Sequence, residues 1–129
     1  MKVYFYTLSD PITEEICYVG QTNNPVARAK QHKDLGHIGG NFLKFLWIGA
    51  LHRKGLEPKF TVIYETDDND VFWKPTKLEA EFIEEYWQMG EPLLNVSSAK
   101  KHRSHKKYPE YIKRISNARF YQVHGFNWY

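Results

Sequence analysis

The chain has 129 residues, of which 42% are hydrophobic and 16% aromatic, so it can bury the core of one domain, and wholesale disorder is excluded. Its single cysteine excludes an intrachain disulfide. Residues 1–95 carry 10 Lys and Arg against 14 Asp and Glu, whereas residues 96–129 carry 8 against 1, so the basic end favours a polyanionic partner. No stretch approaches the roughly 18 apolar residues of a membrane span, so we expect no membrane association and a cytoplasmic location.

The first two elements predict a β-hairpin. Residues 2–8 and 15–20 are rich in β-branched and aromatic side chains, and turn-forming residues separate them. A turn centred on Pro11 would place Tyr4 opposite Tyr18 on the same face of the hairpin. These two tyrosines can be a plain aromatic cross-strand pair, or they can share a functional site.

Helices and one further strand follow along the chain. Asn24 before Pro25 predicts a helix that runs to about residue 35, because asparagine caps helices and proline suits their first position. A second helix is predicted over residues 41–54, and a third strand over residues 59–65. A last helix opens at Thr76 and runs to about residue 89.

The element order is therefore β-β-α-α-β-α, followed by a basic extension. This order predicts a small α/β sandwich with a three-stranded antiparallel or mixed sheet flanked by helices. We expect residues 1–95 to form the domain and residues 96–129 to form the extension. The extension should hold a short helix over residues 109–120 and should pack on the body or contact DNA.

Three polar residues in these elements are candidates for chemistry. Arg28 and His32 are four residues apart and lie on one face of the predicted helix, where a solvated basic face is the alternative interpretation. Glu79 borders the apolar face formed by Phe82 and Tyr86, so its carboxylate needs a partner. That partner can be a backbone N–H in a capping box, a cation or a metal, and these interpretations are not exclusive.

Taken together, these positions resemble the GIY-YIG nuclease family. The sequences VYF (3–5) and YVG (18–20) look like its two tripeptides, with Gly20 ending the second. Arg28 and His32 fall at the family's arginine and at its histidine-or-tyrosine position. The 14-residue spacing from Tyr4 to Tyr18 is on the long side for the family, and Lys2 replaces its usual first glycine.

The later part of the chain continues the resemblance to residue 95. The sequence LEAEFI (78–83) resembles the helix with the family's metal-binding glutamate, which makes Glu79 the matching acid. The sequence PLLN (92–95) matches its closing Pro…Asn pattern, and we expect Asn95 to tie backbone segments together. Gly20 is expected to be structural in the same way, as a turn glycine.

The resemblance implies a metal-dependent DNA endonuclease. Tyr4 would be the general base, and Tyr18 would orient the water or contact phosphate. Arg28 would clamp the phosphate and His32 would relay a proton. Glu79 would hold one Mg²⁺ or Mn²⁺ ion per active site.

Basic residues in two regions are predicted to contact nucleic acid, although those of the extension can also form a solubilising tail. They are Lys30, Lys33, Lys100, Lys101, Arg103, Lys106 and Lys107. The expected partner is double-stranded DNA, bound by a monomer or homodimer. The resemblance is greatest to compact phage-type or mobile-element members such as homing endonucleases, which implies the cytoplasm of a bacterium or phage-infected cell. The alternatives are a catalytically inactive nucleic-acid-binding module of the same fold, and a structural protein with coincidental matches.

Overall fold

The structure is a computed structural model that describes residues 2–33, 41–67, 75–95 and 108–124. The elements follow the predicted order β-β-α-α-β-α, and two further helices come after them. In chain order they are β1 (Lys2–Ser9), β2 (Ile16–Thr22), α1 (Pro25–Lys33), α2 (Phe42–Arg53), β3 (Lys59–Asp67), α3 (Pro75–Gln88), α5 (Tyr108–Asn117) and α6 (Arg119–His124). None of the helices in the described ranges is long and apolar enough to cross a membrane.

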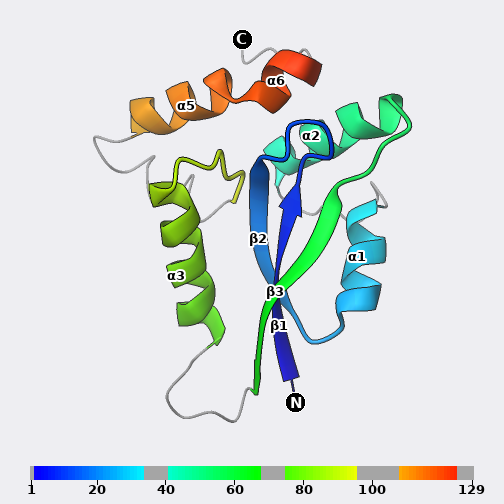
Figure 1. Ribbon diagram of the computed structural model, residues 1–129, viewed down its shortest axis with the longest axis vertical. Coiled ribbons are helices and arrows are strands. Elements are labelled where there is room, and N and C mark those ends of the chain that lie inside the picture. The colour runs from blue at the N-terminus through cyan, green and yellow to red at the C-terminus, as the bar shows by residue number, and fades with distance from the viewer. Residues whose placement is uncertain (1, 34–40, 68–74, 96–107, 125–129) are drawn as a thin grey trace.

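The three strands form one antiparallel sheet with the order β2-β1-β3. Neighbouring residues of β1 point to opposite faces of this sheet. Phe5 packs against Phe82 of α3, and Tyr6 packs against His32 of α1, with ring centroids 5.4 Å apart in both pairs. The two helices therefore cover opposite faces of the sheet, as Figure 1 shows. The predicted small α/β sandwich, a three-stranded antiparallel sheet flanked by helices, is confirmed.

The predicted register of the hairpin is wrong. Tyr18 lies opposite Leu8 rather than Tyr4, and Tyr6 lies opposite Gly20. The pairing is thus displaced by four residues along β1. The displacement brings a different tyrosine, Tyr6, next to Tyr18, with their ring centroids 6.3 Å apart.

The cause of the displacement is a longer turn than the one centred on Pro11. Asp10 Oδ1 accepts hydrogen bonds from the backbone N–H groups of Ile12 and Thr13, at 2.9 and 3.1 Å. Glu14 then adopts a positive φ of 64°, which closes the turn. A side chain that satisfies two backbone donors stabilises this wider connection, so the centre of the hairpin moves toward β2.

The first helix has its predicted cap, and the second begins one residue later than predicted because Asn41 caps it. Asn24 Oδ1 accepts the N–H of Ala27 at 3.1 Å, and Asn41 Oδ1 accepts the N–H of Lys44 at 3.0 Å. The first helix is described from Pro25 to Lys33, and the rest of its predicted extent to about residue 35 lies outside the described residues. The Thr76 side chain, and with it the predicted capping box of α3, lies outside the described side chains.

The segment after α3 runs along the outer edge of β2. Leu94 N–H donates to Cys17 O at 2.6 Å. The Asn95 amide accepts from Val19 N–H at 3.0 Å and donates to Val19 O at 2.7 Å. Asn95 therefore makes the tie between backbone segments that its place in an apolar stretch predicts.

The C-terminal helices pack onto the body at the end of the sheet where the hairpin turns (Figure 1). The single helix expected over residues 109–120 is divided into α5 and α6. Ile115 and Phe120 are fully buried in the main core. Arg114 lies over the Trp87 ring, 3.8 Å from its centroid, and Phe120 N–H donates to Glu15 Oε1 at 2.9 Å. These contacts join the extension to α3 and to the hairpin.

Candidate active site

A buried phenol and a buried imidazole form the centre of the candidate site. Tyr6 Oη and His32 Nε2 are 2.7 Å apart, and both residues are buried. The hairpin supplies Tyr6 from β1, whereas α1 supplies His32 one turn after Arg28. Phe60 of β3 stacks on Tyr6 with ring centroids 4.5 Å apart, so the hydrogen bond lies in apolar surroundings.

Tyr6, and not Tyr4, is the tyrosine of β1 that meets Tyr18 and His32. Tyr4 lies two residues further from the turn, opposite Thr22. One signal in the sequence pointed to the displacement. Tyr6 and Tyr18 are 12 residues apart, which removes the long spacing that Tyr4 requires.

Gly20 has a packing role in place of the expected turn role. It lies within β2, directly opposite Tyr6. A Cβ atom at this position would overlap the hydroxyl group and ring of Tyr6. Because glycine has no side chain, the phenol of Tyr6 can pack directly against the backbone of residue 20.

Arg28 and Glu79 act on the same phenols from two further elements. Arg28 of α1 hydrogen-bonds to Tyr6, and its charge lowers the pKa of both tyrosines. Glu79 of α3 has a hydrogen bond to the Gln21 side chain of β2, and its charge raises the pKa of both tyrosines. Burial is the largest influence and raises the pKa of Tyr6, Tyr18 and Glu79 overall. The site thus combines two phenols, one cation and one carboxylate.

Lys44 is a part of this cluster that the sequence analysis missed. Its Nζ lies 4.3 Å from the centroid of the Tyr18 ring, and the residue is buried. Burial and the charge of Arg28 lower its pKa to about 8. The available signal was a charged residue within the apolar sequence FLKFLWIGAL of α2. Burial, Lys44 and Arg28 together lower the pKa of His32 to about 3, so this imidazole is neutral at physiological pH.

The comparison with protein families agrees with this arrangement. The family model that describes the GIY-YIG catalytic domain matches residues 2–91. The chain belongs to the GIY-YIG family. No curated protein and no solved structure matches it. Membership makes the domain a nuclease domain, and it implies a nucleic acid as the class of substrate.

The GIY-YIG family is generally dependent on a divalent metal, and one carboxylate of this site fits that requirement. Glu79 is half-buried, and burial raises its pKa, so a nearby cation would stabilise its charged form. Within the described ranges no three His, Cys, Asp or Glu side chains gather into a metal cage. Mg²⁺ is commonly held by one or two carboxylates, waters and substrate phosphates, so a single glutamate beside a phosphate site fits this ion.

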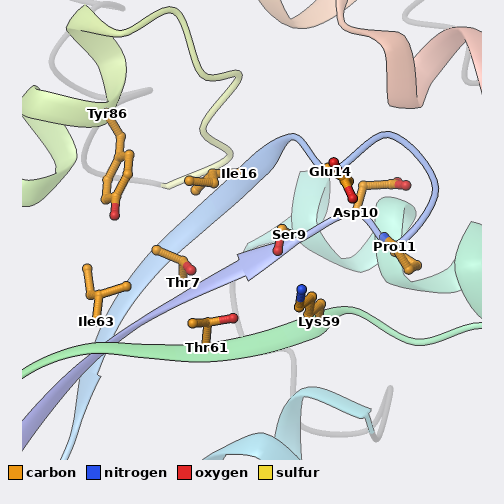
Figure 2. Close-up of a pocket in the computed structure, with 10 residues that line it drawn as sticks. All are labelled: Thr7, Ser9, Asp10, Pro11, Glu14, Ile16, Lys59, Thr61, Ile63 and Tyr86. Atoms are coloured by element: carbon orange, nitrogen blue, oxygen red, sulfur yellow. The ribbon is translucent and has the colours of Figure 1, made fainter.

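A separate groove of about 580 Å³ lies away from the GIY-YIG tyrosines. Figure 2 shows its lining of Thr7 and Ser9 from β1, Thr61 from β3 and Tyr86 from α3. Thr7 is the neighbour of Tyr6 and points to the opposite face of the sheet. None of the residues that line the groove belongs to the cluster around Tyr6, so the groove is not the candidate active site.

The basic residues predicted to contact nucleic acid fall mostly outside the described side chains. Lys30 of α1 is described, and it is exposed. The side chain of Lys33 and residues 100–107 of the extension lie outside the described part of the chain.

Proposed function

We propose that this GIY-YIG protein is a divalent-metal-dependent DNA endonuclease in which Tyr6 is the general base. The observation that supports this role is the 2.7 Å hydrogen bond between Tyr6 Oη and His32 Nε2. Because a proton acceptor is already in reach, Tyr6 can take a proton from the attacking water while its own proton moves to His32. Tyr6 therefore does not have to be deprotonated before the reaction begins, which suits a phenol whose pKa is raised by burial.

Arg28 has two parts in this proposal. In the free protein it hydrogen-bonds to Tyr6, whose side chain is fully buried. A phosphodiester anion is a stronger partner for a guanidinium than a phenol, so substrate would draw Arg28 onto a phosphate oxygen and uncover Tyr6. There Arg28 stabilises the negative charge that develops during attack. Tyr18, which is only half-buried, would contact the phosphate or orient the water.

Glu79 would hold the metal ion, Mg²⁺ or Mn²⁺, with one ion in each site. When bound, such an ion supplies Lewis-acid stabilisation of the phosphoryl oxygens. Glu79 and Arg28 then flank the two phenols with opposite charges, which gives a phosphodiester a defined orientation. The carboxylate takes no part in the proton transfer from Tyr6 to His32.

Double-stranded DNA is the proposed substrate. Lys30 and Lys33 of α1, with the lysines and arginine of residues 100–107, would contact the DNA backbone. One cluster cuts one strand in each engagement, so a monomer would nick and a double-strand break would take a homodimer or two visits. A compact phage-type or mobile-element nuclease in the bacterial cytoplasm is the setting that we propose.

Incubation of supercoiled plasmid with Mg²⁺, Mn²⁺ or EDTA tests the function. We expect nicked plasmid to accumulate before linear plasmid with either metal, and no cleavage in EDTA. Glu79→Gln should lose at least about a hundredfold in cleavage rate while it keeps DNA binding and fold. Glu81→Gln is the matched control, because Glu81 is an exposed acid on the same helix.

Two results would contradict the proposal in different ways. Full activity of Glu79→Gln in clean preparations would remove the metal-binding role of this glutamate. DNA binding without cleavage under every divalent ion would favour the alternative, an inactive nucleic-acid-binding module of the same fold.

A further inference from the structure

Lys44 is a buried cation whose position is fixed by the start of α2. Asn41 accepts the backbone N–H of Lys44 at 3.0 Å and donates its amide to Leu94 O at 2.7 Å. The Lys44 ammonium group then lies 4.3 Å from the ring centroid of Tyr18, and the residue is 5% exposed. In the described part of the chain no carboxylate forms an ion pair with this ammonium group. A cation buried in this way is costly unless the site uses it.

His32 is a titratable group whose pKa is lowered first by burial and then by the charge of this cation. The His32 ring contacts Tyr6, Tyr18 and Phe60, with centroid separations of 5.4, 5.7 and 6.5 Å. The charged groups that act on it are Lys44 from α2 and Arg28 from its own helix, and both are cations. The charge of Glu79 from α3 raises the pKa of the two tyrosines, and the charge of Arg28 lowers the pKa of Glu79.

The two hydrogen bonds at the Tyr6 oxygen indicate the direction of proton movement. Arg28 has only donors, so Tyr6 Oη accepts from it. The hydroxyl proton of Tyr6 is then free to point at His32 Nε2, 2.7 Å away. A doubly protonated His32 would have no acceptor at Nε2 and could not take this proton. The relay therefore requires the neutral imidazole.

We propose that Lys44 is a positioning residue of this site: its ammonium group lies beside the Tyr18 ring that His32 also contacts, and together with burial it favours the neutral His32 that accepts the Tyr6 proton, until a bound phosphodiester offsets its charge. This inference rests on the proposed nuclease function. In the step itself, a water proton moves to Tyr6 Oη as the hydroxyl proton of Tyr6 moves to His32 Nε2. The hydroxide equivalent attacks phosphorus, and the bond from phosphorus to the leaving oxygen breaks. Phosphate charge next to Lys44 and Arg28 offsets their repulsion of the imidazolium that forms.

Titration of His32 by NMR tests the inference without any need for cleavage. In the wild-type protein the His32 ring should stay neutral to the lowest pH at which the protein is folded. Lys44→Met should raise the pKa of His32 by about one unit, because one of the two cations that lower it is removed. Lys44→Arg should keep the low value, and Lys59→Met, which removes an exposed charge elsewhere, should leave it unchanged. If Lys44→Met does not fold, Lys44→Gln replaces it.

Two further measurements extend the test to substrate and to reaction. A short DNA duplex added in EDTA should raise the pKa of His32 in the wild-type protein. The acid limb of the kcat/KM profile should move to higher pH in Lys44→Met and stay in place in Lys44→Arg.

An identical His32 titration in the wild-type protein and Lys44→Met would overturn the inference, even if the wild type cuts DNA. A His32 shift in a protein that cuts nothing would support the electrostatic role of Lys44 and refute the nuclease function instead. An unchanged acid limb in an active Lys44→Met would show that Lys44 has no part in the relay.

Discussion

Two buried polar clusters are built on the same hairpin, one at its turn and one on its paired strands. At the turn, Asp10 is fully buried and its carboxylate accepts from the Ile12 and Thr13 N–H groups. The Trp47 indole donates to it at 2.9 Å, and His124 pairs with it at 2.7 Å. Burial would raise the pKa of Asp10, but these hydrogen bonds outweigh burial and lower it.

The second cluster lacks such compensation. Around Tyr6, two cations and a neutral histidine approach two phenols, and the pKa values of Lys44 and His32 are both lowered. Both oxygens of the Asp10 carboxylate have partners among the described residues, so this cluster stabilises the fold. Among the described residues, the cluster at Tyr6 combines the two cations Arg28 and Lys44 with the single carboxylate of Glu79, so its net charge is positive and suits an anion. A buried carboxylate whose oxygens are all hydrogen-bonded thus indicates structure, and a buried cluster with an excess of one charge indicates function.

The largest effect that tests this contrast is the loss of the proposed base. Tyr6→Phe should reduce the cleavage rate by about 10²–10⁴, because it removes the group that takes the proton. Tyr4→Phe is the matched control on the same strand and face, and it should keep nearly full activity. Single-turnover cleavage of plasmid DNA, with a melting curve for each variant, measures both.

The opposite result for these tyrosines would change the assignment. An active Tyr6→Phe with an inactive Tyr4→Phe would restore the base expected from the sequence. Loss of activity in Tyr18→Phe alone would move the base to Tyr18, whose ring is more exposed.

The second prediction concerns the cluster at the turn. Asp10→Ala should lower the free energy of unfolding by about 3 kcal/mol, because the buried Trp47 indole and two backbone N–H groups lose their acceptor. Glu14→Ala, an exposed acid of the same turn, should cost far less. Urea unfolding at neutral pH measures both. Equal losses of unfolding free energy in the two variants would show that the hydrogen bonds of Asp10 do not dominate the stability of the hairpin turn.

The third prediction joins fold and site at one position. Gly20→Ala should cost about 1–3 kcal/mol of stability, because its Cβ overlaps the phenol of Tyr6, which Phe60 and His32 hold in place. Cleavage should fall further than stability explains, since the displaced phenol is the proposed base. The cleavage rate, measured at a temperature where the variant is fully folded, separates the effect on catalysis from the effect on the unfolding free energy. Wild-type activity in Gly20→Ala would argue against a fixed position of Tyr6.

The smallest effect is a pH dependence of stability. The folded protein holds His32 at a pKa of about 3 against an ordinary value of 6.5, so the unfolded chain binds more protons between these values. Stability should therefore fall as the pH is lowered from about 6.5 toward 3, by about 1–2 kcal/mol at pH 5. His32→Gln should lack this loss, which urea unfolding at pH 7 and pH 5 measures. The contribution of Asp10 is lost only below its ordinary pKa of 3.8. The same pH slope in His32→Gln and wild type would refute the assignment to His32.

The sequence predicted elements well where local chemistry determines them. The cap at Asn24 and the tie at Asn95 follow from the polar groups that each residue must satisfy. The register of the hairpin did not follow, because it depends on how Asp10 bonds across the turn. That displacement alone exchanged Tyr4 for Tyr6.

The rest of the site could not be predicted, because it depends on contacts between residues that are far apart in the sequence. Lys44 reaches Tyr18 only because α2 packs beside the hairpin, and no spacing rule predicts such a contact. Glu79 was found through the resemblance, whereas its hydrogen bond to Gln21 joins two elements far apart in the chain. Charge balance around a phenol is a property of the folded molecule and is not visible in a linear pattern.

The segment that runs beside β2 has a consequence for self-association. Leu94 and Asn95 occupy backbone groups along the outer side of β2, so this border of the sheet is closed to another chain. In the described residues β3 pairs only with β1, which leaves the far border open. A homodimer that extended the sheet from one copy into the next would have to meet at β3 on both sides. A sheet extended in this way would stop at a dimer, because the β3 edge of each copy is then paired and the β2 edge is already covered.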